Sequence, residues 1–166
     1  MENKNIKLLT INAVLAAIYV LLTMLFASFS FGAIQIRIAT ALYQLVAYDK
    51  KYFWGMVLGV TIANLLFSPL GLLDILVGWG VTGLGLALAI LINRKVKKLA
   101  VRSLVVGLCV SFGMIFVALE LVYVSKAPFL ITYVYLIAGQ AVSQIIGYVL
   151  FGIINTKISL KRLIEQ

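Results

Sequence analysis

Six apolar stretches fill this 166-residue chain, and short segments that carry most of its lysine and arginine residues separate them. Hydrophobic residues make up 64% of the sequence, only 11% of residues are charged, and the mean hydropathy is +1.15. A soluble domain of this length needs more charged surface than that. A membrane-spanning helix needs roughly 20 mostly apolar residues, so six of them use most of the chain. We therefore expect an all-α membrane protein, a six-helix transmembrane bundle that forms a single integral-membrane domain over residues 1–166.

The apolar stretches give approximate boundaries for the six spans, at residues 5–27, 34–48, 52–67, 72–92, 103–123 and 129–154. The Ser68-Pro69-Leu70-Gly71 turn ends the third span, because proline and the residue before it resist continuation of a helix. A basic block from Arg94 to Lys98 ends the fourth.

The basic residues indicate an orientation. If both termini lie on one side of the membrane, that side collects 12 of the 14 basic residues and leaves only Arg37 and Lys126 opposite. Loops rich in Lys and Arg stay in the cytoplasm, so we expect both termini there, in the membrane of a bacterial cell. Topology and anionic lipid then explain the formal charge of +9. A nucleic-acid surface is disfavoured, since the basic residues are scattered over four short segments.

Several chemistries are excluded by missing residues. The chain has no histidine, and its single cysteine, Cys109, lies inside a predicted span. Metal sites of the His/Cys type and histidine-dependent catalytic triads are therefore excluded. No glycine-rich phosphate loop with Lys-Ser/Thr is present, so the chain cannot hydrolyse ATP itself. We expect no catalytic residue and no cofactor, and any energy from ATP has to come from a partner.

Charged residues at membrane depth are energetically expensive and commonly mark function. Arg37, Asp74 and Glu120 are of this kind, and all three fall toward the outer ends of their predicted helices. Polar or aromatic residues join them at that level, namely Gln35, Asn64 and Trp79. A convergence of polar groups from several helices is what an outward-facing substrate-binding pocket requires.

Each of these residues also has a simpler interpretation. Arg37 can reach the outer interface with its long side chain, although Thr40 and Gln44 continue a polar stripe below it, which favours a role inside the bundle. Asp74 can cap the fourth helix, where a carboxylate favours the helix dipole, or it can bind a ligand or Arg37. Glu120 can lie at the interface, or it needs a partner from another helix or a ligand.

The last span adds Tyr133, Gln140 and Gln144, which share one helical face. The amides of glutamine donate and accept hydrogen bonds, so they suit a heteroaromatic ligand or bonds between helices equally well. Trp79 and Tyr133 lie near the outer end, where aromatic residues commonly form an interfacial belt. Stacking on a flat ligand ring is the functional alternative.

Pairs of small residues four positions apart recur in the first, third and sixth spans: Ala13 and Ala17, Gly55 and Gly59, and Gly139, Ser143 and Gly147. This spacing lets helix backbones approach closely. Packing inside the bundle explains all of them. For Ala13 and Ala17 we favour a surface that docks on a partner subunit.

A six-span protein below 200 residues, with A-x-x-x-A in its first helix and no ATP site, is similar to the substrate-binding S-components of energy-coupling factor (ECF) transporters. Within that class, Gln35-Ile36-Arg37-Ile38-Ala39-Thr40-Ala41-Leu42 and Gly71-Leu72-Leu73-Asp74 resemble the queuosine-precursor transporter family, QueT. The resemblance implies a membrane subunit that binds a 7-deazaguanine base at its outer face. It also implies docking through the first helix onto a transmembrane coupling subunit that works with two ATPase subunits.

The residues fit such a ligand. A deazaguanine presents a ring N–H and an exocyclic amine on one edge, and a carboxylate accepts both as a bidentate pair. Its carbonyl needs a donor such as Arg37 or a glutamine amide. The alternatives are an S-component for another small vitamin-like nutrient, a carrier that works alone, and an intramembrane enzyme. Residues 1–83 and 84–166 share no recognisable polar pattern, which disfavours a carrier built from inverted repeats. The enzyme is disfavoured because the chain lacks a nucleophile paired with a base.

Overall fold

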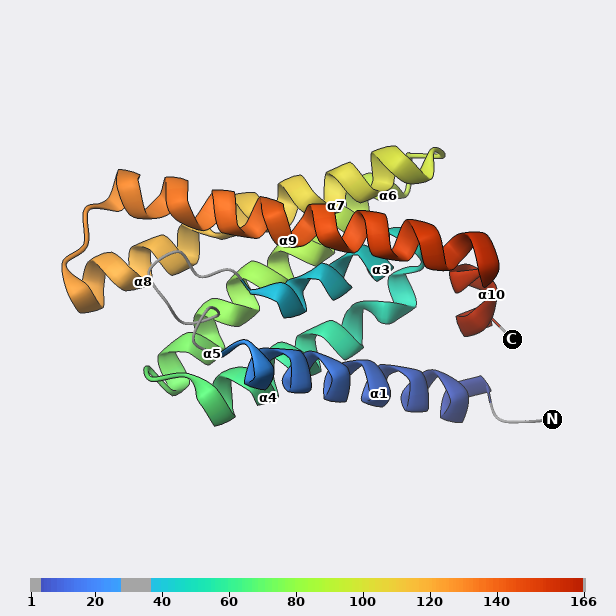
Figure 1. Cartoon of the computed structure of the whole chain (residues 1–166), viewed down its shortest axis with the longest axis horizontal. Coiled ribbons are helices and arrows are strands. Elements are labelled where there is room, and N and C mark those ends of the chain that lie inside the picture. The colour runs from blue at the N-terminus through green and yellow to red at the C-terminus, as the bar shows by residue number, and fades with distance from the viewer. Residues whose placement is uncertain (1–3, 28–36, 166) are drawn as a thin grey trace.

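The structure, a computed structural model, describes residues 4–27 and 37–165, and every regular element in this part of the chain is helical (Figure 1). In chain order the elements are α1 (Lys4–Leu25), η1 (Ile38–Gln44), α3 (Leu45–Tyr48), η2 (Lys50–Tyr52), α4 (Phe53–Phe67), α5 (Leu72–Gly78), η3 (Trp79–Leu84), α6 (Gly85–Asn93), α7 (Leu99–Gly113), α8 (Ile115–Ser125), α9 (Phe129–Lys157) and α10 (Leu160–Glu165). The predicted Gln35 lies outside the described residues.

Four helical stretches of the described residues are long and apolar enough to cross a membrane: Lys4–Leu25, Leu72–Asn93, Leu99–Ser125 and Phe129–Lys157. They coincide with the predicted first, fourth, fifth and sixth spans, the fifth beginning four residues earlier than expected. The other two predicted spans correspond to shorter helical segments, Ile38–Tyr48 and Phe53–Phe67. The all-helical class and the four long apolar helices are confirmed, whereas six complete crossings stay a prediction.

The connections between the helices gather at the two ends of the bundle. The start of α1, the α3–α4 and α6–α7 connections and α10 gather at one end, and the α4–α5 and α8–α9 connections lie at the other (Figure 1). The end that carries the start of α1 and α10 is called the basic end below, because its connections contain Lys50, Lys51 and the block Arg94 to Lys98.

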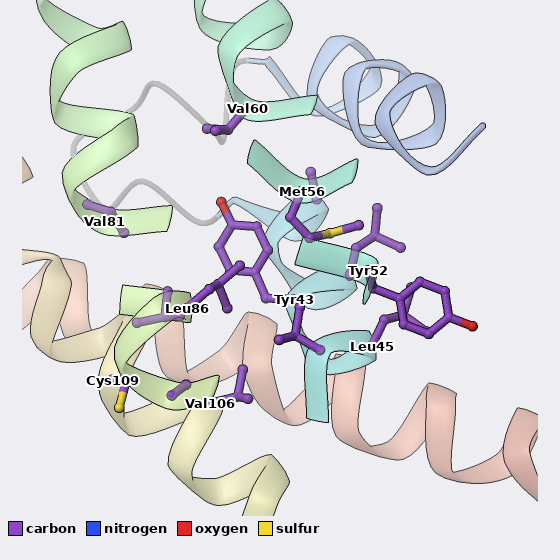
Figure 2. Close-up of a cluster of buried hydrophobic side chains, with 14 of the residues drawn as sticks. Tyr43, Leu45, Tyr52, Met56, Val60, Val81, Leu86, Val106 and Cys109 are labelled. Carbon is purple, nitrogen blue, oxygen red and sulfur yellow. The ribbon is translucent and has the colours of Figure 1, made fainter. Parts of the chain in front are cut away.

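The short central segment formed by η1 and α3 is the most buried part of the fold. Every residue from Ala39 to Tyr48 is buried, and the segment packs against α9, α1 and α7. Tyr43 lies in the middle of the apolar core, with its hydroxyl directed toward the side where Val60 and Val81 lie (Figure 2). The surrounding helices expose large apolar residues such as Leu9, Leu72 and Leu130. Buried charged and polar side chains beneath an apolar surface are the arrangement expected for a protein in lipid.

Small residues bring helices close at two places. A Cβ on Gly55 would lie 2.8 Å from Oδ1 of Asn12, and one on Gly59 would lie 2.7 Å from Cβ of Tyr19. The helices α1 and α4 therefore touch along the Gly55 and Gly59 face. On α9, a Cβ at Gly147 would overlap the backbone carbonyl of Ala41 in η1. The predicted packing role of these glycines is consistent with both contacts.

The turn between α4 and α5 forms where the sequence predicts it. The helix α4 ends at Phe67, and α5 begins at Leu72 after Ser68-Pro69-Leu70-Gly71. Gly71 has φ = +59°, a backbone conformation that costs a glycine little. The hydroxyl of Ser68 accepts a 3.0 Å hydrogen bond from the backbone N–H of Leu70. The turn thus places the first residues of α5 beside the end of α4.

Candidate functional site

Three charged side chains from three different elements meet inside the bundle. Arg37 precedes η1, Asp74 lies in the first turn of α5, and Glu120 lies in α8. Their exposed fractions are 8%, 5% and 5%. The carboxylates of Asp74 and Glu120 interact with each other, and the guanidinium of Arg37 acts on Glu120 electrostatically. The structure therefore brings the three predicted charges into one buried cluster and does not place them separately at the interface.

Asn64 connects two members of this cluster. Its side-chain Nδ2 donates a 2.6 Å hydrogen bond to the backbone carbonyl of Asp74, and its Oδ1 accepts a 3.5 Å bond from Nη1 of Arg37. The carboxylate of Asp74 accepts a hydrogen bond from the Ser68 hydroxyl, so the α4–α5 turn also orients it. Asn64 is only 2% exposed, and these bonds satisfy polar groups that would otherwise be costly to bury.

The two glutamines of α9 differ in their partners. Oε1 of Gln140 accepts a 3.2 Å hydrogen bond from the Thr40 hydroxyl, and its Nε2 is buried with no hydrogen-bond partner in the described part of the chain. Both amide atoms of Gln144 are used, since Nε2 donates to the carbonyl of Thr40 and Oε1 accepts from Nε2 of Gln44. Gln144 therefore joins α9 to η1, whereas Gln140 keeps a donor for another group.

A small cavity lies beside the cluster. Its walls come from η1, from the α5–η3 junction and from α8 and α9, and they include Arg37, Thr40, Tyr43, Gly78, Thr82 and Gln140. The cavity volume is about 10 Å³, enough for about one water molecule. Pockets that hold small molecules commonly measure about 300–1,000 Å³. The cavity is therefore closed to a heterocyclic ligand in this conformation.

A chain of hydroxyl groups that sequence reasoning missed runs along one wall. The hydroxyls of Tyr19 and Tyr43 lie 3.1 Å apart, and the Tyr43 hydroxyl lies 2.6 Å from Oγ1 of Thr82. The α-helical period aligns Arg37 with Thr40 and Gln44, and so it leaves Tyr43 out. The segment is a 3₁₀ helix, in which residues three apart align. The period of three therefore puts Arg37, Thr40 and Tyr43 in one line, and all three border the cavity.

Two predicted site residues lie elsewhere. Trp79 is 52% exposed, and its Nε1 donates a 2.8 Å hydrogen bond to the hydroxyl of Thr61 on the outside of the bundle. Tyr133 donates to the backbone carbonyl of Phe112 at 3.3 Å, and its ring stacks on Phe129 with centroids 5.7 Å apart. Neither residue lines the cavity beside Arg37. Their positions agree with the interfacial alternative for aromatic residues.

Glu120 and Gln140 each keep one buried side-chain atom that has no hydrogen-bond partner among the described residues. Oε1 of Glu120 is buried without a hydrogen-bond partner among the described residues. Glu120, Asp74 and Asn64 do not line the cavity itself, which Arg37 and Gln140 do. Nε2 of Gln140, on the neighbouring helix α9, is a buried donor without a partner in the same part of the chain. Within residues 4–27 and 37–165, no group of three or more His, Cys, Asp and Glu residues could hold a metal ion.

Comparison with known proteins gives two matches. The family model described as QueT transporter matches residues 9–156. The protein named "Queuosine precursor transporter QueT" from Lactococcus lactis subsp. cremoris (strain MG1363) is 30% identical over 170 residues, which cover 97% of this chain and 99% of that protein. No solved structure matches the chain.

Proposed function

This chain belongs to the QueT transporter family, and we propose that its substrate is a queuosine precursor, a 7-deazaguanine base. As a member of this family it is a multi-pass membrane transporter and not an enzyme. The name of the L. lactis relative supports the substrate. The proposed site depends on one observation. Glu120 in the buried cluster has an unused acceptor, and Gln140 in the wall of the adjacent cavity has an unused donor.

In the proposed complex the base enters the cavity beside Arg37 after its walls separate. The carboxylate of Glu120 or Asp74 accepts hydrogen bonds from the ring N–H and the exocyclic amine, as a bidentate pair. Nε2 of Gln140 or the guanidinium of Arg37 donates to the carbonyl of the ring. A precursor with an aminomethyl group is cationic at neutral pH and uses the second carboxylate. Asn64 holds Arg37 and the start of α5 in position for these contacts.

The proposed mode of transport is that of the S-component of an ECF importer. Both termini lie in the cytoplasm, six helices cross the membrane as a single domain, and the base is captured at the outer face. A transmembrane coupling subunit with two ATPase subunits supplies the energy. The exposed Ala13 and Ala17 support a docking surface, because Asn12, Ala16 and Tyr19 on the opposite face of α1 already pack against α4.

Calorimetry on the purified protein in detergent tests the substrate and the site together. We expect 7-aminomethyl-7-deazaguanine and 7-deazaguanine to bind. 7-Deazahypoxanthine, which differs from 7-deazaguanine only by lacking the exocyclic amine, should bind at least about tenfold more weakly than 7-deazaguanine. The Asp49→Asn variant is the control, since Asp49 lies at the basic end, away from the cluster. Absence of binding by any deazaguanine contradicts the proposed substrate. Equal binding of 7-deazaguanine and 7-deazahypoxanthine contradicts recognition of the donor edge by a carboxylate.

A further inference from the structure

A second polar cavity lies at the basic end of the bundle, and the proposed transport function does not use it. It measures about 380 Å³ and lies between α3, η2, the end of α6, the start of α7 and α10. Five basic residues and one acidic residue are among the described residues that line it: Lys50, Lys51, Arg94, Arg102, Lys161 and Asp49. These side chains come from segments far apart in the sequence, so the fold itself gathers the positive charge.

The positive charge of this cavity exceeds its negative charge. The acidic residue of the lining, Asp49, is already engaged, because its Oδ1 accepts a 2.8 Å hydrogen bond from the backbone N–H of Lys51. Like charges that share a cavity beside a low-dielectric interior repel each other more strongly than they do in water. A bound anion relieves this repulsion.

Arg102 shows where an anion would make its strongest contact. Its Nε is buried and has no hydrogen-bond partner among the described residues. The backbone carbonyl of Arg102 accepts a 3.1 Å hydrogen bond from Nδ2 of Asn93, which joins the end of α6 to the first turn of α7. A buried donor without a partner is uncommon in folded proteins. The planar guanidinium, with Nε among its donors, matches the oxygens of a phosphate group.

We propose that this cavity binds a phosphate group, carried by the headgroup of an anionic phospholipid or present as free phosphate. Basic pockets between transmembrane helices bind lipid headgroups in this way. The concave shape and the convergence of five elements favour a compact anion over the extended acidic surface of another protein. The site is independent of the Arg37 cluster and does not rest on the proposed substrate.

Thermal unfolding of the full-length protein in a neutral detergent tests the proposal. The probes are phosphatidylglycerol, phosphatidylcholine, inorganic phosphate and poly-glutamate. We expect phosphatidylglycerol or inorganic phosphate to raise Tm and phosphatidylcholine to leave it unchanged. A shift with phosphatidylglycerol alone identifies lipid as the source, whereas an equal shift with inorganic phosphate identifies free phosphate.

Variants test whether the residues of this cavity cause the shift in Tm. Arg102→Gln should weaken the response to the effective probe by about tenfold in midpoint concentration, and Arg102→Lys should restore part of it. Arg162→Gln is the matched control, because Arg162 is exposed on α10 and does not line the cavity. If Arg102→Gln does not fold, Lys50→Gln, whose side chain is exposed, carries the same test.

Three results would overturn the proposal. The first is no shift of wild-type Tm with either phosphate source. The second is a loss of response in Arg162→Gln as large as that in Arg102→Gln or Lys50→Gln. The third is a larger shift with poly-glutamate than with either phosphate source, which would assign the cavity to an acidic protein surface.

Discussion

The side chain of Asn64 donates a 2.6 Å hydrogen bond to the backbone carbonyl of Asp74, and so ties the end of α4 to the first turn of α5. The same side chain accepts a bond from Arg37. One neutral amide therefore sets the relative positions of a buried cation and a buried acid that are distant in the sequence.

Replacement of this amide should damage both the fold and the site. In Asn64→Ala the carbonyl of Asp74 and the guanidinium of Arg37 each lose a buried partner, at a cost of about 1–3 kcal/mol in the free energy of unfolding. We expect a lower Tm in detergent and weaker binding of the deazaguanine. Thr61→Val is the matched control, one turn earlier on α4, where the hydroxyl's bonds to the exposed Trp79 and to the carbonyl of Val57 on the same helix are lost. Equal effects of the two substitutions would show that the Asn64 contacts are unimportant.

Neutralisation of the charged cluster should reduce affinity without a change of shape. Loss of one partner of a buried charged pair costs about 2–5 kcal/mol, which corresponds to a loss in affinity of about 30-fold to several thousand-fold. We expect a loss in this range for Glu120→Gln or Asp74→Asn, and calorimetry on each variant shows which acid contacts the base. Arg37→Gln tests the cation in the same way. If all three variants bind within about threefold of wild type, the cluster is structural and the base binds elsewhere.

The close approach of α9 and η1 should make Gly147 intolerant of any side chain. The Cβ of Gly147→Ala would overlap the carbonyl of Ala41, and such overpacking costs about 1–3 kcal/mol. Gly152→Ala lies on the same helix, and its Cβ would meet no atom within 4 Å. We therefore expect thermal unfolding in detergent to show a lower Tm for Gly147→Ala and a Tm at or above wild type for Gly152→Ala. The reverse order would contradict the close contact between α9 and η1.

The exposed face of α1 should matter for uptake and not for binding. Ala13→Trp or Ala17→Trp puts a bulky side chain where a partner helix has to approach closely, so ATP-driven uptake in cells should be lost while calorimetry on the purified protein is unchanged. Ile153→Trp, an exposed position on α9, is the control and should retain uptake. Normal uptake by both alanine variants would remove the support for docking through α1.

The orientation can be tested with single cysteines in a Cys109→Ala background. A cysteine at position 98, in the α6–α7 connection, should be protected from a membrane-impermeant thiol reagent applied to whole cells. A cysteine at position 126, in the α8–α9 connection, should react. Both positions are exposed in the structure, so burial within the protein does not explain protection. Labelling at position 98 from outside the cell would reverse the proposed topology.

The sequence predicted the positions of the helices well, because long apolar stretches and the Pro-Gly turn are local signals. It did not predict the 3₁₀ form of Ile38–Gln44 or the π-helical turns of Trp79–Leu84 inside the fourth apolar stretch. Both depend on packing against other helices, which no local pattern records. The same limit applies to the site. The charged residues could be identified because a charge in an apolar helix is energetically costly. The alignment of Tyr43 with Arg37 required knowledge that this segment is a 3₁₀ helix.

The closed cavity beside Arg37 has a consequence for the energetics of capture. Because it holds about one water molecule, the proposed binding of a base there requires a separate, open conformation. The measured dissociation constant then combines the intrinsic affinity of the open form with the fraction of molecules that are open. A substitution in a cavity wall that touches no ligand atom can therefore change affinity by changing that fraction alone.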